Sequence, residues 1–458
     1  MKIIIVGCGE VGRALAARLN EASNQITVID SDPAKVNNLA ARLDIMSVVG
    51  NGATHAVQQE AGVASADLLI AVTGSDEVNI LCCLLARSSG RCSTIARIKN
   101  PEYHRDVPYI KEKLGLAMVI NPEQAAAEEI ARVLRFPNAI KIERFAKGRA
   151  ELMKFRLPEG SPLAGVQVKD LAAKFGVDVL VCTVERVVNK EEQALIADGE
   201  VVIAEKDVIS IMATRRNAVD FFRKINYKFR SIRNVMIVGG TKTAHYLTAL
   251  LRRDGIPVKI IDRDHAVCDE LTDIWSGDKG VTVVEGDPSD QEILLEEGVD
   301  QADAFVALTG LDEENILLSL FAKSVGHGKV LTKINRIDFN SVVSHLDLES
   351  TIYPKYLTAD EIERYVRATA AASDSAMETL YHIIPGKVET SEFIVQEESA
   401  VTGVPLYKLQ LKKGVLVAAI IREDQVLIPH GRDEIRAGDR VVIVSNLMNI
   451  HALPDILK

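Results

Sequence analysis

The chain has 458 residues, of which 47% are hydrophobic and 26% are charged, and its formal net charge is −10. This balance is typical of folded globular proteins and excludes disordered and collagen-like chains, while the acidic charge argues against a large nucleic-acid-binding surface. The length predicts two to four domains at roughly 100 to 200 residues per domain. No apolar run reaches the roughly 18 to 20 residues needed to cross a bilayer, so we expect no membrane-spanning segment.

The N-terminus and the cysteines indicate the cytoplasm. Residues 1–7 carry one charge and reach a glycine after a few apolar residues, which is too short a stretch for a secretory signal. The six cysteines lack C-x-x-C spacing, so the sequence predicts neither a disulfide framework nor a metal site. We expect reduced thiols, most of them buried.

The first third of the chain alternates short apolar runs with helix-like stretches. The apolar runs cover residues 3–6, 27–29, 46–49, 68–72 and 94–98. Such alternation is typical of β-α-β units, in which a parallel sheet is covered by helices on both faces. The sequence therefore predicts an α/β fold, with a doubly wound Rossmann-like domain over residues 1–135.

A small α+β module is expected next, over residues 140–222. Its predicted strands cover residues 151–157, 177–186, 193–196, 200–203 and 207–212, with one helix near 168–175. A helix is also predicted over Pro122 to Leu134, because proline suits the first turn and the apolar residues fall on one face. This helix packs either on its own core or on a second subunit.

The second half of the chain repeats the first. Matching residues lie 232 positions apart: Gly7 and Gly239, Asp30 and Asp262, Pro122 and Pro354, Ile130 and Ile362. Residues 73–80 match residues 309–316 at 236, which indicates a four-residue insertion near residues 275–280. The sequence therefore predicts a tandem duplication, with a second Rossmann-like domain at 232–367 and a second α+β module at 372–458.

A complete G-x-G-x-x-G motif follows the first predicted strand and opens a helix. It consists of Gly7, Cys8, Gly9, Glu10, Val11 and Gly12. In this motif the first glycine allows the turn, the second lets the backbone approach a pyrophosphate, and the third lets the helix pack closely on the strand. The phosphate then meets the N-terminus of the helix, where free N–H groups favour an anion.

Five further residues complete the expected first site. Asp30 ends the second strand, where a carboxylate bonds the ribose hydroxyls and disfavours a 2′-phosphate, so NAD(H) is preferred over NADP(H). Asn51 and the pair Thr73 and Gly74 follow the third and fourth strands, at the edge of the sheet where ligands bind. Arg97 ends the fifth strand and is placed to meet phosphate. Asn51, Thr73, Asn79 and Arg97 are either ligand contacts or ordinary polar residues.

The corresponding turn in the second half departs from the motif. It reads Gly239, Gly240, Thr241, Lys242, Thr243 and Ala244. A Cβ at Thr241 holds the backbone away from a pyrophosphate, yet Asp262 keeps the ribose carboxylate, and the threonines and lysine suit phosphate oxygens. We expect nucleotide binding with altered geometry, the ligand being NAD(H), an adenine nucleotide such as ATP or ADP, or both in competition.

The sequence lacks the groups that a dehydrogenase needs beside its nicotinamide. The α+β modules offer only Asp198 and His430 as titratable candidates, both at turn positions, and Cys82 and Cys83 lie in an apolar helical stretch. A duplicated nucleotide domain without a catalytic domain favours a sensor, in which ligand binding shifts the populations of two conformations. The alternatives are a soluble NAD-dependent oxidoreductase and an assembly scaffold for another partner.

The order of these motifs resembles the regulator-of-conductance (RCK, or KTN) family of potassium channels and transporters. The resemblance covers the whole chain and is carried by GCGEVG at 7–12, VID at 28–30, VVGNG at 48–52 and AVTGSDEVN at 71–79, within the duplicated architecture. It implies a peripheral regulatory subunit at the inner face of the membrane. Four such chains would form a homotetrameric ring under a membrane-embedded potassium channel subunit, and NAD(H), ATP or ADP would gate the ion flux.

The resemblance also implies which residues contact the nucleotides. In the first half these are residues 7–11, Asp30, Thr73, Gly74 and Arg97. In the second half they are residues 239–243, Asp262, Thr309 and Lys333, where lysine replaces the arginine-like position. The family's small C-terminal modules correspond to the two α+β modules.

Overall fold

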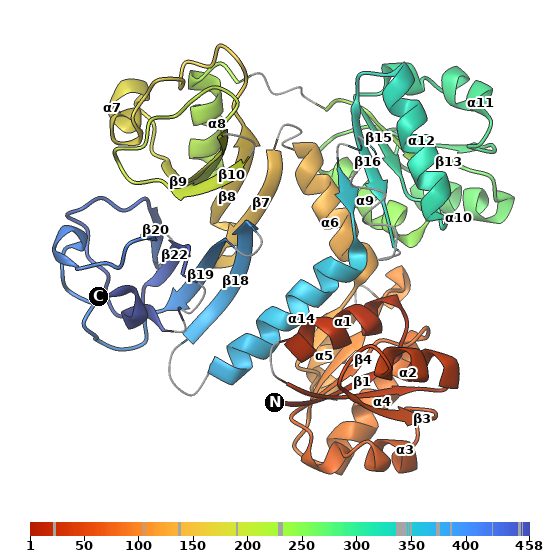
Figure 1. The fold of residues 1–458 in the computed structure, drawn as a ribbon. Coiled ribbons are helices and arrows are strands. Elements are labelled where there is room, and N and C mark those ends of the chain that lie inside the picture. Colours follow the sequence, from red (N-terminus) through yellow and green to blue (C-terminus); the bar gives the residue numbers. More distant parts are fainter. Residues whose placement is uncertain are drawn as a thin grey trace. The chain divides into compact units, whose positions relative to one another are not determined.

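The computed structural model describes all residues except 22–23, 104–105, 136–138, 189–190, 228–231, 336–345, 347, 349, 372–375, 385–386, 424, 448–449 and 451. The chain divides into two compact units, each built from two separate segments (Figure 1). One unit comprises Met1–Arg135 with Ser231–Glu363, and the other comprises Phe136–Arg230 with Arg364–Lys458. Each unit therefore takes one segment from each half of the duplicated sequence.

The first segment of the first unit is a doubly wound domain. Its six parallel strands lie in the order β3-β2-β1-β4-β5-β6. The elements are β1 (Lys2–Val6), α1 (Glu10–Glu21), β2 (Gln25–Asp30), α2 (Pro33–Ala40), β3 (Met46–Val49), α3 (His55–Glu60), β4 (Leu68–Ala71), α4 (Asp76–Ser89), β5 (Ser93–Arg97), α5 (Val107–Leu114) and β6 (Met118–Ile120). The strand order reverses between β1 and β4, and ligands of such sheets bind beside this switch point.

The second segment of this unit repeats that topology. Its parallel strands lie in the order β14-β13-β12-β15-β16-β17. The elements are β12 (Val235–Val238), α9 (Lys242–Arg253), β13 (Val258–Asp262), α10 (His265–Trp275), β14 (Val281–Glu285), α11 (Gln291–Glu296), β15 (Ala304–Ala307), α12 (Asp312–Val325), β16 (Lys329–Lys333) and β17 (Thr351–Ile352). The predicted duplication of the α/β fold is confirmed.

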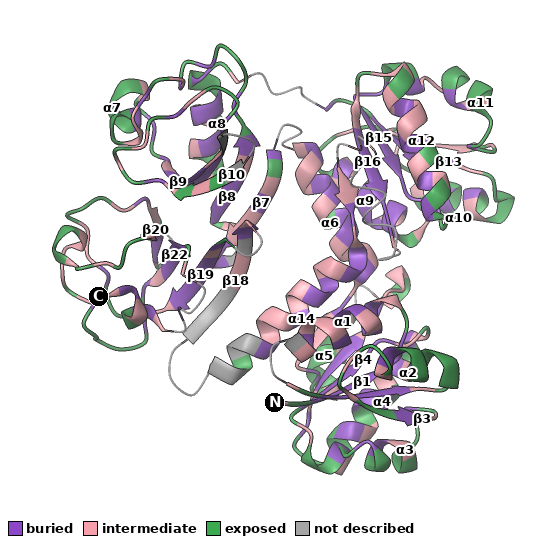
Figure 2. Cartoon of the chain, in the orientation of Figure 1, coloured by how far each residue is buried: buried purple, intermediate pink, exposed green. Residues whose placement is uncertain are grey.

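Burial explains why the central strands are apolar throughout. Every residue of β4, β12 and β15 is buried, whereas the outer helices α2, α3 and α10 carry the exposed residues (Figure 2). Strands covered by helices on both faces have no solvent-facing side, so they show continuous apolar runs and no alternation. All six cysteines are free and buried, as expected from their apolar surroundings.

The two segments of the first unit exchange their connecting helices. The apolar face of α6 (Pro122–Arg135) joins the core of the second segment, where Ala127, Ile130 and Leu134 pack with Leu247 and Leu251 of α9. The sequence left open whether this helix packs on its own core or on a second subunit. It packs instead on the other half of its own chain.

The helix α14 (Pro354–Ala371) makes the reciprocal contact with the first segment. Arg18 of α1 pairs with Asp360, and its Nε donates to Glu363 Oε2 at 2.9 Å. Near the start of the same helices, Lys355 Nζ lies 3.3 Å from Glu10 Oε2. Each connecting helix therefore belongs to the packing of the opposite segment.

The second unit consists of two antiparallel modules. The first has the order β10-β9-β11-β8-β7, and the second has the order β18-β19-β22-β20-β21. The elements are β7 (Ala139–Phe145), β8 (Ala150–Arg156), α7 (Leu171–Phe175), β9 (Leu180–Val188), β10 (Glu191–Ile196), β11 (Val208–Ala213), α8 (Arg215–Lys224), β18 (Ala376–Ile384), β19 (Val388–Ile394), β20 (Val415–Arg422), β21 (Gln425–Leu427) and β22 (Arg440–Ser445). The modules share a core in which Phe145 and Met212 meet Val388 and Val444.

Two expectations for the first module need correction. The strand expected at residues 200–203 is absent, because Val202 forms only an isolated bridge with Gln167 and the segment is otherwise a loop. The strand β7 was missed, because half of its residues are partly exposed and it lacks a clean apolar alternation. Among the described residues, no helix is both long enough and apolar enough to span a membrane.

Candidate functional site

The turn between β1 and α1 requires its glycines for three different reasons. Gly7 has a φ of +105°, in the region that favours glycine. A Cβ at Gly12 would lie 1.8 Å from the carbonyl oxygen of Gly7, so the helix packs against the turn only without a side chain. A Cβ at Gly9 would meet no atom within 4 Å. The protein leaves the space above Gly9 open, which is where the motif brings a pyrophosphate to the backbone.

The carboxylate of Asp30 braces this turn. Its Oδ2 accepts a hydrogen bond from the Cys8 amide at 2.6 Å, and its Oδ1 accepts one from the Asp32 amide at 2.9 Å. Burial, with a smaller contribution from Asp30, raises the pKa of the Cys8 thiol to about 12, so this cysteine is not a thiolate at neutral pH. Asp30 thus lies at the end of β2 next to the glycine turn, as the motif requires.

Thr73 and Arg97 belong to one hydrogen-bonded group. Asn79, which is fully buried, accepts from the Thr73 amide at 2.7 Å and donates to the Arg97 carbonyl at 3.0 Å. The Arg97 guanidinium donates to the Thr73 carbonyl, and its Nε is buried without a hydrogen-bond partner among the described residues. Burial lowers the pKa of Arg97. Hydrogen bonds from Asn79 and Arg97 to the Thr73 backbone therefore fix the loop after β4.

The remaining predicted residues of the first site differ in position. Asn51 is exposed and its Oδ1 accepts from the Ala53 amide at 2.9 Å, so it shapes a local turn. Gly74 has open space at its Cβ position. Val11 is buried, whereas Glu10 reaches Lys355 of α14. The structure brings together the glycine turn, Asp30, Thr73 and Arg97 at one edge of the sheet, and it leaves Asn51 in its own turn.

The second turn keeps the backbone conformation of the first. Gly239 has a φ of +99°, and the Gly240 amide donates to Asp262 Oδ2 at 2.6 Å, as Cys8 does to Asp30. Thr241 stands at the N-cap position of α9 but makes no capping bond, because its buried hydroxyl has no hydrogen-bond partner among the described residues. Ala244 is fully buried at the position of Gly12. The turn therefore keeps its conformation although Thr241 and Ala244 replace the second and third glycines of the motif.

The polar side chains of the second turn do not all face a ligand. Lys242 is exposed, but Thr243 is buried like Val11 at the equivalent position, so its hydroxyl points away from solvent. Thr309 is held by Asn315 through a 2.8 Å bond to its amide. Lys333 is buried, and its Nζ donates to the Leu308 carbonyl at 3.2 Å.

Electrostatics link the second turn to the opposite segment. Burial lowers the pKa of Lys333, and the charge that opposes this most strongly is Glu123 of α6. The first turn has the reverse arrangement, since Lys355 of α14 approaches Glu10. Sequence reasoning missed both contributions, because nothing local indicates that the connecting helices cross over.

Two aspartates were also missed. Asp76 is buried, and its Oδ2 accepts from the amides of Lys99 and Asn100 at 3.0 and 2.9 Å. Asp312, at the matching place in the repeat, accepts from the Asn335 amide at 2.9 Å. The repeated Asp-Glu after each Thr-Gly pair was the available signal. Both carboxylates fix the loops after β5 and β16 beside the candidate sites.

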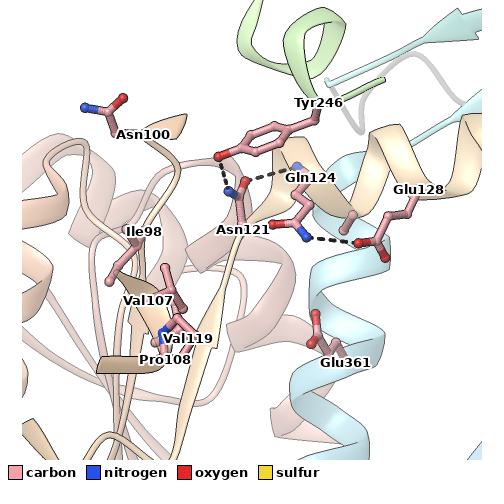
Figure 3. Close-up of a pocket in the computed structure, with 11 residues that line it drawn as sticks. Ile98, Asn100, Val107, Pro108, Val119, Asn121, Gln124, Glu128, Tyr246 and Glu361 are labelled. Carbon is pink, nitrogen blue, oxygen red and sulfur yellow. Dashed lines mark hydrogen bonds between the residues drawn. The ribbon is translucent and has the colours of Figure 1, made fainter. Parts of the chain in front are cut away.

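A separate pocket of about 370 Å³ lies at the edge of the first sheet (Figure 3). Asn121 Nδ2 donates to the Tyr246 hydroxyl at 3.0 Å across it, and Gln124 Nε2 donates to Glu128 at 3.0 Å. None of the predicted nucleotide contacts lines this pocket. Within the described part of the chain, no group of three or more His, Cys, Asp or Glu side chains is placed to hold a metal ion.

Comparison with known proteins gives full-length matches. The profile of the TrkA-N domain matches residues 3–122 and 235–354, and that of the TrkA-C domain matches 152–226 and 390–458. The chain is 30% identical to Trk system potassium uptake protein TrkA homolog 1 of Methanosarcina mazei, over 97% of each chain. It is 32% identical to Trk system potassium uptake protein TrkA of Halomonas elongata, over 97% of this chain and 95% of that protein.

Among solved structures, the GsuK channel has the same fold. It superposes with a TM-score of 0.63 at 18% identity, over 98% of this chain and 77% of the channel chain. The GsuK channel bound to NAD gives the same TM-score over 97% and 76%.

Proposed function

Because this chain belongs to the TrkA family of Trk-system potassium uptake proteins, we propose that it is a regulatory subunit that controls potassium uptake in response to bound nucleotides. The observation that carries the nucleotide part of the proposal is the first glycine turn. Its backbone leaves open space above Gly9, and Asp30 stands beside it with the geometry of a dinucleotide site. NAD(H) is the proposed ligand of this site.

The proposed contacts follow from the two turns. In the first site the glycine turn binds the pyrophosphate at the N-terminus of α1, and Asp30 bonds the ribose. Thr73, Gly74 and Arg97 close the site from the loop after β4 and the end of β5. The second site, formed by residues 239–243 with Asp262, Thr309 and Lys333, takes NAD(H) or ATP and ADP, with Thr241 narrowing the approach to the backbone.

The same proposal includes the assembly. Domains at 1–135 and 232–367 bind nucleotide, and RCK C-terminal modules at 140–222 and 372–458 mediate regulation. Four chains form a ring that docks on a TrkH-like membrane-embedded potassium channel subunit, so the protein is peripheral at the inner face of the membrane. A nucleotide that binds two conformations of the ring with different affinity shifts the channel between open and closed states.

Titration calorimetry and potassium flux test this proposal together. The full chain is titrated with NADH, NAD+, ATP and ADP, and flux through the channel subunit is then measured with each ligand that binds. We expect NADH to bind with a Kd well below about 1 mM, an affinity above roughly 4 kcal/mol, and to change the flux. No binding below that concentration, or flux that ignores bound nucleotide, would contradict it. Steady oxidation of NADH with a small substrate would instead support the oxidoreductase.

Asp30→Ala should weaken NADH binding by about 1.5 to 3 kcal/mol, the range for hydrogen bonds to a charged group. Part of this loss comes from the Cys8 amide, which loses its acceptor. Asp30→Asn is the matched variant, because its amide oxygen still accepts from Cys8 while the negative charge is gone. Calorimetry that finds wild-type affinity for Asp30→Ala would remove this residue from the site.

Asp262→Ala is expected to affect only a second class of nucleotide sites. Asp262 accepts a hydrogen bond from the Gly240 amide in the second turn. Its loss should weaken binding at that class by about 10-fold or more, while the first class keeps its affinity. The measurement is calorimetry with NADH and with ATP. Equal weakening of both classes would show that the two turns do not act as separate sites.

A further inference from the structure

The contact between α14 and the first glycine turn pairs a buried ammonium with a partly exposed carboxylate. Lys355 is 2% exposed, and its Nζ lies 3.3 Å from Glu10 Oε2. A buried ammonium is costly unless a carboxylate compensates it, so this lysine needs the partner that it has.

The repeat reverses the charges of this pair. The position equivalent to Glu10 in the second half is Lys242, and the position equivalent to Lys355 in the first half is Glu123. The first half therefore carries a carboxylate at both positions, and the second half carries an ammonium at both. Packing of unlike halves sets Lys355 against Glu10 and places Glu123 of α6 where its charge acts on Lys333 of the second half. Two first halves would instead oppose Glu10 with Glu123. Two second halves would likewise oppose Lys242 with Lys355.

The two halves also differ in side-chain size at equivalent positions of this interface. Tyr246 of α9 accepts a hydrogen bond from Asn121, which precedes α6, at 3.0 Å. The equivalent residues are Ala14 and Tyr353, so each side places one large and one small residue. Two second halves would set Tyr246 against Tyr353 in the same space. Two first halves would set Ala14 against Asn121 and leave a void, which also costs free energy.

A third pair of equivalent positions, Arg18 and Leu250, makes ionic contacts in the first half and apolar contacts in the second. Arg18 pairs with Asp360 and Glu363 of α14. Its equivalent Leu250 packs against the core that α6 completes. There the residue equivalent to Glu363 is Ala131, whereas Glu128 keeps the acidic type of Asp360. Two second halves would set Leu250 against Glu363, whose largely covered carboxylate would lose its Arg18 partner, and a covered carboxylate without a partner is unfavourable.

We propose that the two nucleotide-fold halves are a matched pair that recognise each other through these exchanged positions. The partner of each half is the opposite half, and a copy of the same half is rejected by charge, size and polarity at once. Specificity of this kind combines attraction in the correct pair with repulsion in the wrong ones. Copies of the chain must then associate through other surfaces.

Charge exchange in the full chain, without nucleotide, tests the proposal. K242E/K355E makes both halves acidic, E10K/E123K makes both basic, and the quadruple variant exchanges the two signs. We expect each double variant to lower the thermal midpoint by about 3 to 6 °C, and the quadruple variant to recover most of that loss. K113E/K279E, at two exposed lysines, is the control for net charge.

Two results would overturn the proposal. One is a quadruple variant that loses as much as the two double variants combined, since independent sites add their effects. The other is a thermal midpoint of the double variants that equals that of K113E/K279E. Such a result would mean that like charges at these positions cost nothing beyond the change in net charge, as they would if each half already packed against a copy of itself. If a double variant does not fold, K355E with its rescue variant E10K/K355E gives the same comparison.

Discussion

Gly9→Val is expected to reduce NADH affinity at the first site by about 100-fold or more, a loss of roughly 2.7 kcal/mol, with the fold unchanged. The physical reason is that a Cβ at this position would meet no atom within 4 Å, so the added side chain enters the open space proposed for the pyrophosphate. Calorimetry measures the affinity, and the thermal midpoint without nucleotide reports the fold.

Two other glycines give the matched comparison. Gly277 also has no atom within 4 Å of a Cβ and lies outside the turn, so Gly277→Val should change neither the affinity nor the midpoint. Gly12→Ala should instead destabilise the domain, because its methyl group would meet the Gly7 carbonyl oxygen. Wild-type NADH affinity in a folded Gly9→Val protein would place the pyrophosphate elsewhere.

Asp207→Ala is expected to cost about 2 to 4 kcal/mol of stability in the second unit. Asp207 is 1% exposed and accepts from Arg186 Nε at 2.7 Å, from Arg186 Nη2 at 2.6 Å and from the Ala204 amide at 2.7 Å. Removal of the carboxylate takes the acceptor from the Ala204 amide and leaves the Arg186 guanidinium with its bond to the Val202 carbonyl. Urea denaturation followed by circular dichroism measures the loss.

The repeat supplies a parallel experiment. Asp439 accepts from Arg422 at 2.9 and 2.8 Å and from the Arg436 amide at 2.8 Å, so Asp439→Ala should cost a similar amount. Glu200→Ala is the control, because its pair with Lys169 is exposed and such pairs contribute about 0 to 1 kcal/mol. Equal losses in Asp207→Ala and Glu200→Ala would mean that the buried pair adds nothing beyond a surface contact.

Local features of the site were predictable from sequence. The glycine turn depends on backbone conformation and on contacts within a few residues, and the sequence records both directly. Gly7 has the positive φ, Gly12 has the close contact, and Asp30 ends its strand at the expected place. The same reasoning located Thr73 and Arg97 at strand ends of a parallel sheet.

Long-range features were not predictable. The pattern of α6 showed an apolar face but not its partner, since any apolar surface of the right shape satisfies such a face. The role of Asn79 beneath the Thr73 loop depends on strands brought together only by folding. Thr243 looked like a phosphate ligand by residue type, yet its helix turns it into the core.

The division of the chain into two interleaved units has a consequence for its synthesis. Each unit needs a segment from each half, so residues 1–135 leave the ribosome long before residues 231–363 that complete their unit. Until α9 is made, Ile130 and Leu134 of α6 have no partner surface, and such exposed apolar faces favour aggregation. The nascent first half must therefore remain unfinished until most of the second half has been made. Premature termination would release a fragment that quality-control proteases recognise.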